Sequence, residues 1–145
     1  YISQLPNDTM VIITADHGHT DVLPLEIYAC KTLYNLLDRM PSNDSRCLTF
    51  KVKENKNLEF EELFNKLFKG IYKLYKTEDA IKQGFFGKLD DVRNERTKDF
   101  LADFVAIAIN KYYFIYKENP GHIFKSHHAG ITKNEMLVPV CIIKK

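Results

Sequence analysis

The order of apolar and polar positions along the chain predicts strands and helices in mixed succession. An apolar run rich in β-branched residues at 9–15 is typical of a buried strand, and alternation at 47–53 predicts a strand with one solvated face. Apolar residues at helical spacing predict helices at 27–37 and 57–74. The remaining predicted elements are a short helix at 77–81 that Gly84 ends, a hairpin of strands 104–109 and 112–116, and a last strand at 137–143. This order predicts a mixed α/β fold.

Composition limits the kinds of partner that we expect. The 145 residues are 45% hydrophobic and 28% charged, which fits a single domain over residues 1–145. The net charge is only +2, so we expect neither nucleic acid nor a membrane as a partner. No apolar run approaches the roughly 20 residues that cross a bilayer. Three widely spaced cysteines fit buried free thiols in a reducing compartment, and we therefore expect a cytoplasmic protein.

The first residues indicate that the chain is the carboxyl-terminal part of a longer protein. It begins with Tyr1 rather than Met, and residues 1–5 resemble the end of a helix before a Pro-Asn-Asp turn. A part of a domain exposes apolar surface where the rest of its sheet belongs. We therefore expect the missing N-terminal part to be a partner, with homodimerisation through that surface as an alternative.

The strand predicted at 9–15 ends at a triplet that carries two metal-ligand side chains, Asp16-His17-Gly18. Open α/β sheets place their sites beyond the carboxyl ends of strands, and both carboxylate and imidazole bind zinc. Gly18 permits the backbone to bend there. A strand-end Asp and His also often cap a helix or bind a backbone group. His19 either supports the site, contacts substrate or is an ordinary solvated histidine.

A second histidine-rich stretch near the C-terminus supplies the other half of the candidate site. His127 and His128 precede Thr132 and Glu135, whose spacing is that of a capping box and predicts a short helix. A loop held between this turn and the last strand can fix an imidazole at the edge of the sheet. His128 is the favoured metal ligand, and His127 competes for that role or contacts substrate. Arg46, at the head of a strand, meets a phosphate or forms a surface ion pair.

These two stretches carry a family resemblance. The segment Ile-Ile-Thr-Ala-Asp-His-Gly that ends at Gly18, and the segment His-Ala-Gly-Ile-Thr-Lys-Asn-Glu-Met-Leu-Val-Pro that begins at His128, resemble the carboxyl half of the alkaline phosphatase superfamily. They most resemble its type I phosphodiesterase and nucleotide pyrophosphatase branch; cofactor-independent phosphoglycerate mutases and PglZ-type proteins are relatives. The resemblance implies the C-terminal part of an alkaline-phosphatase-like α/β/α sandwich. Strands 9–15, 47–53 and 137–143 would belong to its mostly parallel central sheet.

The resemblance also implies two divalent metal ions, zinc first, with manganese or magnesium as alternatives. Asp16 and His17 would bind the ion beside the nucleophile, and His128 would bind the second ion. Two ions roughly 4 Å apart activate a hydroxyl nucleophile and stabilise a transferring phosphoryl group. The substrate would be a small phosphate ester, whether a diester, a pyrophosphate or a monoester, and the superfamily leaves sulfate and phosphonate substrates open as well.

The chain departs from the family pattern because it contains neither an Asp-x-x-x-His pair nor a nucleophile loop before Asp16. We therefore expect no catalytic nucleophile in this chain and negligible phosphohydrolase activity for it alone. Two other functions remain open. One is a non-catalytic binding or accessory module that keeps the fold. The other is an interaction domain that docks partners on the apolar helix face at 57–74, which burial of Phe64 and Phe68 would exclude.

Overall fold

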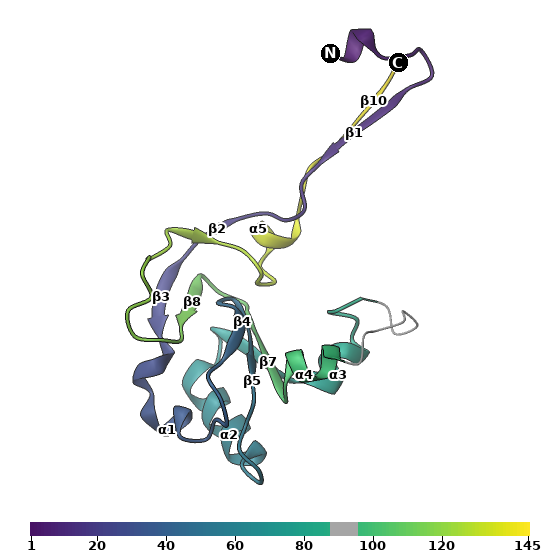
Figure 1. Cartoon of the computed structure of the whole chain (residues 1–145). Coiled ribbons are helices and arrows are strands. Elements are labelled where there is room, and N and C mark those ends of the chain that lie inside the picture. The colour runs from purple at the N-terminus through teal and green to yellow at the C-terminus, as the bar shows by residue number, and fades with distance from the viewer. Residues whose placement is uncertain (88–95) are drawn as a thin grey trace.

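The body of the molecule is built on a four-stranded antiparallel sheet. The computed structural model describes residues 1–87 and 96–145. In the order β4-β5-β7-β6, the sheet contains β4 (Ser42–Asp44), β5 (Cys47–Phe50), β7 (Phe104–Ala108) and β6 (Tyr72–Lys76). Figure 1 shows α2 (Asn57–Phe68) beside this sheet; α3 (Thr77–Lys82) contacts β6 and β7, and α4 (Arg96–Leu101) contacts β5. The predicted helix at 77–81 is thus confirmed, and Gly84 follows it with φ of 79°.

Strand β7 lies between two apolar layers. Its residues Phe104, Ala106 and Ala108 pack in the cluster that contains the phenylalanines of α2. The alternate residues Val105 and Ile107 pack on the opposite side, with the apolar residues of α3 and β6. Because side chains alternate along a strand, a strand covered on both faces is apolar throughout. This explains why all five residues of β7 are buried.

Helix α2 is shorter than predicted, and its apolar face is core. Phe60 and Phe64 are fully buried and Phe68 is 7% exposed. The prediction of helix to residue 74 is wrong, because Gly70 turns the chain with φ of 76° and the following residues alternate as β6. Burial of the phenylalanine face excludes the docking domain considered above.

The two strands of the predicted hairpin exist, but they do not pair with each other. Both edges of β7 are occupied by β5 and β6, so β8 (Tyr112–Ile115) pairs in parallel with β3 (Leu23–Glu26). A 3-10 turn, η2 (Ile27–Ala29), and a single helical turn, α1 (Lys31–Tyr34), follow β3. The prediction of one continuous helix at 27–37 is therefore wrong. The segment consists of these two short turns and ends at Leu37, which forms a β-bridge with Val52.

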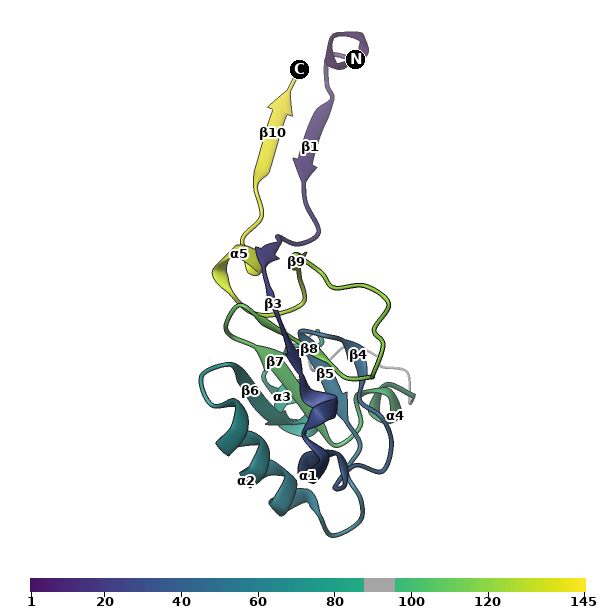
Figure 2. The ribbon, with the colours of Figure 1, turned by 90° about the vertical axis from the view of Figure 1, so that its left-hand side faces the viewer.

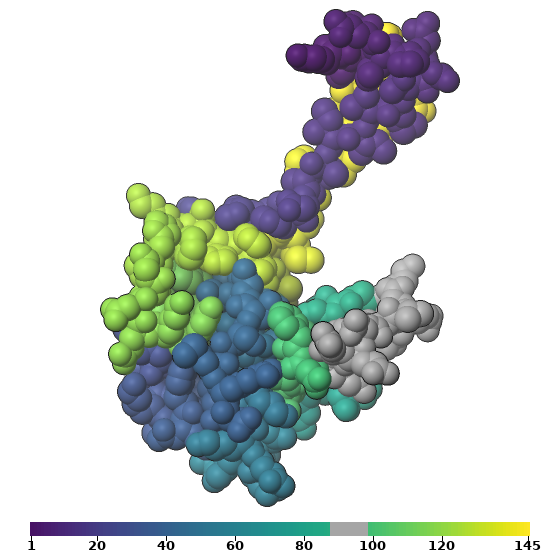
Figure 3. Space-filling view, viewed as in Figure 1, coloured from purple at the N-terminus to yellow at the C-terminus, as the bar shows by residue number. Residues whose placement is uncertain are grey.

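An antiparallel arm projects from the body. It consists of β1 (Met10–Thr14) and β10 (Val140–Lys144), and both chain termini and η1 (Ile2–Gln4) lie at its far end (Figures 1 and 2). The space-filling view shows the arm standing clear of the body (Figure 3). Ile12 and Ile142 face each other across the ribbon and are 59% and 58% exposed, and Ile13 is also exposed. The arm is therefore apolar on both faces without being covered.

The pairing of the arm strands differs from the mostly parallel central sheet that the resemblance implied. Within the described residues, the strands predicted at 9–15 and 137–143 pair only with each other and are exposed rather than buried. The strand predicted at 47–53 belongs to the antiparallel sheet, and within residues 1–87 and 96–145 only β3 and β8 pair in parallel. The apolar pattern determines that a strand forms, but the partner depends on segments far away in sequence. The mixed α/β class is confirmed, and no described helix is long and apolar enough to cross a membrane.

The cysteines are free but not uniformly buried. Cys30 and Cys47 are partly buried, whereas Cys141 on the arm is exposed. Burial raises the pKa of the Cys47 thiol to about 11, so this thiol stays protonated and unreactive at neutral pH. The expectation of three buried thiols is therefore wrong for Cys141.

Truncating the centre of the α2 face tests whether this face is core. Phe64 contacts the rings of Phe50, Phe60, Phe68 and Phe114. We expect Phe64→Ala to lower the free energy of unfolding by about 3–5 kcal/mol in urea denaturation, because it leaves a cavity in a packed cluster. Leu58→Ala, on the same helix and 70% exposed, is the control and should change it by less than about 1 kcal/mol. Equal effects of the two substitutions would contradict the packing.

Candidate metal centre

A short strand pair joins the two histidine-bearing stretches. Thr20 of β2 (Thr20–Asp21) pairs with His127 of β9 (Ser126–His127) in an antiparallel bridge. The pairing brings the His17 and His128 rings to a centroid distance of 3.9 Å, stacked at 15°. Two residues more than a hundred positions apart in the sequence are thus in direct contact.

Asp16 and His17 can hold one ion together. The Oδ2 atom of Asp16 lies 3.5 Å from Nε2 of His17, and Oδ1 accepts a hydrogen bond from the His17 backbone N–H. Ligands on a tetrahedral zinc ion, with bonds of about 2.0 Å, lie roughly 3.3 Å apart. Nδ1 of His17 lies 2.8 Å from the carbonyl oxygen of Gly18 and must donate to it, because a carbonyl only accepts. That leaves Nε2 as the ligand atom, and a backbone partner of this kind is typical of metal-binding histidines.

His128 sits among imidazoles, and this position favours its neutral form. Burial and the adjacent His17 ring lower the pKa of His128, and the Asp44 carboxylate opposes the shift. A neutral imidazole is the form that binds a metal ion.

His19 and His127 belong to different clusters around His128. The His19 ring lies 5.5 Å from the His17 ring and 5.3 Å from the His128 ring, and the residue is exposed. His127 is largely buried, with Nδ1 located 3.5 Å from Oδ1 of Asp44. Among the described residues, two groups have ligand atoms within 4.8 Å of one another: His17, His19 and His128 form one, and Asp44, His127 and His128 form the other. Asp16 belongs to neither group, and its side chain is 86% exposed.

A buried ion pair holds the His128 loop. Glu135 in α5 (Lys133–Met136) forms the predicted capping box with Thr132. Its carboxylate also accepts hydrogen bonds from the Gly130 backbone N–H at 2.8 Å and from Nη2 of Arg46 at 2.7 Å. Arg46 is fully buried and donates through Nη1 to the carbonyl oxygens of Asn110 and Tyr112. Both expectations for Arg46, a phosphate contact or a surface pair, are therefore wrong.

Sequence reasoning missed this role of Arg46 because the partner lies 89 residues away. Of the two partners, only Glu135 has a recognisable sequence pattern, because a capping-box glutamate before an apolar segment can be identified from local spacing. Burial and three sets of donors act on that carboxylate. Its burial alone would raise the pKa, but the hydrogen bonds from Arg46, Thr132 and Gly130 lower the pKa of Glu135 to about 2.

Gly18 is required for a different reason from the one predicted. Its backbone N–H donates to the carbonyl oxygen of Glu135 at 2.8 Å, which pins the Asp16-His17 loop to α5. A Cβ atom at this position would lie 1.8 Å from the carbonyl oxygen of Asn134. The close approach of two backbones, and not a bend that only glycine allows, therefore excludes a side chain.

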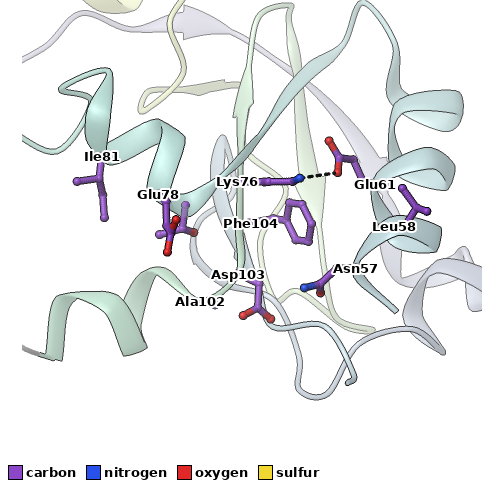
Figure 4. A pocket seen from close by; sticks show the side chains of 10 residues that line it. Asn57, Leu58, Glu61, Lys76, Glu78, Ile81, Ala102, Asp103 and Phe104 are labelled. Carbon is purple, nitrogen blue, oxygen red and sulfur yellow. Dashed lines mark ion pairs between the residues drawn. The ribbon is translucent and has the colours of Figure 1, made fainter. Parts of the chain in front are cut away.

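A pocket of about 480 Å³ lies away from these histidines. It is lined by residues of α2, β6, α3 and the start of β7 (Figure 4), where Lys76 pairs with Glu61 at 3.7 Å. None of the predicted site residues is among those that line it. The candidate chemistry therefore belongs to the surface cluster at the base of the arm.

Residues 2–135 match the family model of type I phosphodiesterases and nucleotide pyrophosphatases. The match spans both motif stretches, from Asp16 to His128, and covers most of the chain. The chain belongs to this family. The resemblance read from the two motifs is confirmed, and with it the placement in the alkaline phosphatase superfamily.

Solved structures of the family share the fold at low sequence identity. Murine ectonucleotide pyrophosphatase/phosphodiesterase 5 is 18% identical with a TM-score of 0.61, over 96% of this chain and 35% of that one. An inactive form of the murine protein in complex with AMP gives 17% identity and a TM-score of 0.60, over 90% and 33% of the chains. The human protein gives 18% and 0.58, over 94% and 34%. The chain thus spans about a third of the length of these family members, and no curated protein matches it.

Removing Arg46 tests whether the ion pair supports the fold of this family member. We expect Arg46→Met to lower the free energy of unfolding by about 3–5 kcal/mol in urea, because Glu135 is left charged and buried without its partner. Lys51→Met removes a partly exposed pair with Asp103 and should cost less than about 1 kcal/mol. A cost for Arg46→Met no larger than that of this control would contradict the role of the pair.

Glu135 also predicts how stability depends on pH. Its pKa is lower in the folded state than its ordinary value of 4.5, so its stabilisation is complete above pH 4.5 and is lost as the pH falls toward 2. We expect Glu135→Gln to be less stable than wild type by about 3 kcal/mol at neutral pH, with the difference shrinking across that acidic window. Thermal unfolding at a series of pH values measures it. Glu59→Gln, at an exposed residue, should show no such convergence.

Proposed function

We propose that the chain supplies part of the two-metal site of a phosphodiesterase/nucleotide pyrophosphatase-type hydrolase. Asp16 and His17 bind one divalent ion, and His128 binds the other. The observation that carries the proposal is the contact between the His17 and His128 rings at 3.9 Å, because the family motifs meet in space as a shared site requires.

The donor set supports zinc as the first candidate ion. Mixed carboxylate and imidazole donors suit zinc and manganese, whereas magnesium prefers oxygen ligands. When bound, two such ions supply a Lewis-acid clamp on the transferring phosphoryl group and an activated hydroxyl. The chain's own residues position the ligands. The Gly18 carbonyl fixes the His17 tautomer, and Glu135 holds both loops through Gly18 and Gly130.

The remaining ligands and the nucleophile belong to the upstream part of the protein in this proposal. The chain has no Asp-x-x-x-His pair, and we infer negligible hydrolysis by the chain alone. The uncovered apolar arm supports a partner there, since it offers strand edges to further strands, with Ile12 and Ile142 exposed on one face and Ile13 exposed on the other. A second copy of the chain is the alternative occupant.

The substrate class in this proposal is a small phosphate ester. One murine relative is described in complex with AMP, which suggests a nucleoside phosphate as the first ligand to try. Groups near the nucleophile determine whether such an enzyme prefers a phosphodiester, a pyrophosphate or a phosphomonoester. The substrate assay must therefore include all three classes.

A non-catalytic accessory module is the second candidate function. The observation in its favour is that the carboxylate most needed for the first ion, Asp16, is 86% exposed and lies outside both ligand groups. Such a module would keep metal affinity and the fold without chemistry.

Activity of the protein with its upstream segment tests the proposal. We expect hydrolysis of bis(p-nitrophenyl) phosphate that a chelator abolishes and Zn²⁺ restores. Asp16→Asn and His128→Ala should each lower kcat/KM on the order of 100-fold or more, because each removes an ion ligand. His122→Ala, in the loop beside Phe124, is the control and should leave the rate unchanged. Full activity of the Asp16 and His128 variants would contradict the proposed metal site. Hydrolysis by the 145-residue chain alone would contradict the proposal that the nucleophile lies in the upstream part of the protein.

A further inference from the structure

The pocket of about 480 Å³ between the first turns of α2 and α3 and the start of β7, here called the α2–α3 pocket, is of a size that suits a small molecule. Leu58, Ile81 and Phe104 form the apolar part of its lining. Figure 4 shows the Phe104 ring between the Lys76–Glu61 pair and Asp103. Leu58 is 70% exposed, so a molecule bound in the pocket covers apolar surface that the fold leaves in water.

Hydrogen bonds fix the wall that the start of β7 contributes. The Thr77 backbone N–H donates to the Asp103 carbonyl oxygen at 3.0 Å, and the Thr77 hydroxyl donates to the Leu101 carbonyl oxygen at 3.1 Å. Ala102, between these two acceptors, has a left-handed backbone with φ of 57°, which residues with a Cβ atom rarely adopt. The wall is therefore formed before a ligand binds, and a preformed site loses less free energy to ordering.

Carboxylates outnumber ammonium groups in the lining of the pocket. They belong to Glu61, Glu78 and Asp103, and the ammonium group belongs to Lys76. Lys76 pairs with Glu61 at 3.7 Å, and Asp103 pairs with Lys51 at 2.9 Å. Glu78 is exposed and has no hydrogen bond or ion pair within the described part of the chain. The charge left uncompensated in the pocket is therefore negative.

We propose that the α2–α3 pocket binds a small organic amine, whose ammonium group pairs with Glu78 and whose hydrocarbon part packs on Leu58, Ile81 and Phe104. A hydrogen bond between two charged groups is roughly twice as strong as one between neutral groups, and covering the apolar lining adds to binding in proportion to the area. A bound anion would be repelled by Glu78, while the Lys76 ammonium group is already paired. This site goes beyond the proposed function, because its lining contains no residue of the candidate metal centre.

The first turns of the two helices give the competing interpretations. The N-terminus of α2 carries a partial positive charge that attracts anions, and Lys56 provides no side-chain cap there. However, Glu59 in the first turn of α2 already complements this charge. Glu78 lies in the first turn of α3, where it also stabilises the helix without binding anything. Asp79 lies in the same turn but does not line the pocket, so comparing the two carboxylates separates a ligand contact from a helix effect.

Titration of the isotope-labelled 145-residue chain with benzylamine, followed by NMR, tests the site. We expect saturable binding with a Kd on the order of 1 mM, as for a ligand of this size, and shifts confined to the starts of α2, α3 and β7. Benzyl alcohol and benzoate resemble benzylamine in shape but are neutral and anionic. They should bind at least about 10-fold more weakly, because neither can form the charged pair with Glu78.

Variants identify the groups responsible. Glu78→Gln should weaken benzylamine binding by about 10-fold or more, because it removes the charged acceptor. Asp79→Asn removes an equal charge from the same helical turn and should bind as wild type does. Leu58→Ala should weaken binding by about threefold, because it removes part of the apolar wall. Unchanged spectra for residues outside the pocket verify that the variants fold.

The other outcomes overturn the proposal. Binding of benzyl alcohol as tight as that of benzylamine would show an apolar hollow without selectivity for a cation. Equal effects of Glu78→Gln and Asp79→Asn would show general electrostatic attraction rather than a contact. Shifts located elsewhere, or no saturable shift, would show that the pocket is not an amine site. None of these results tests the phosphodiesterase proposal, because the readout is amine binding away from the histidines.

Discussion

The buried pair between Arg46 and Glu135 is the constraint on which the site depends. Arg46 lies in the turn between β4 and β5, directly before the first residue of β5, and Glu135 ends the capping box of α5. Through its carboxylate Glu135 holds the Gly130 backbone, and through its carbonyl oxygen it holds Gly18. Both histidine-bearing loops are therefore fastened to one residue, and that residue is fastened to the sheet. Desolvating two charges is costly unless every donor and acceptor is satisfied, and here Arg46 also donates to two backbone carbonyls.

In this arrangement, the groups that hold the loops in place are different from the candidate metal-binding side chains. The groups that fix the loops are buried and fully hydrogen-bonded, whereas the imidazoles that can bind an ion lie at the surface. Side chains that bind an ion must be able to change rotamer, whereas the backbone segments to which they belong must keep their positions. The backbones at Gly18 and Gly130, close in sequence to His17 and His128, are the parts of the two loops that hydrogen bonds to Glu135 fix. Neither glycine tolerates a Cβ atom, since backbone or charged side-chain atoms already occupy the space.

Local signals in the sequence predicted local features well. The strand tendency of residues 10–14, the capping box at Thr132 and Glu135, and the short helix before Gly84 all depend on residues within a few positions, and all form. Pairing was not predictable in this way. The same apolar run that predicts a buried parallel strand becomes one side of an exposed antiparallel arm, because its neighbour among the described residues is β10 alone. Likewise, an alternating pattern could not reveal that β5 and β6 occupy both edges of β7 and leave β8 to β3.

In the candidate site, too, local features were predictable and long-range pairing was not. Asp16, His17 and His128 were predicted from motifs, because residue type and short-range spacing carry that signal, and the structure brings the rings of His17 and His128 into contact. His19 was expected to support the site, contact substrate or be a solvated histidine, because its position depends on the register of a two-residue bridge that no local pattern encodes. The pairing of Thr20 with His127 carries His19 toward His128, and the ring centroids of His17, His19 and His128 lie 3.9–5.5 Å apart. A single backbone pairing thus decides whether the third imidazole is a solvated side chain or lies beside the two that the family motifs supply.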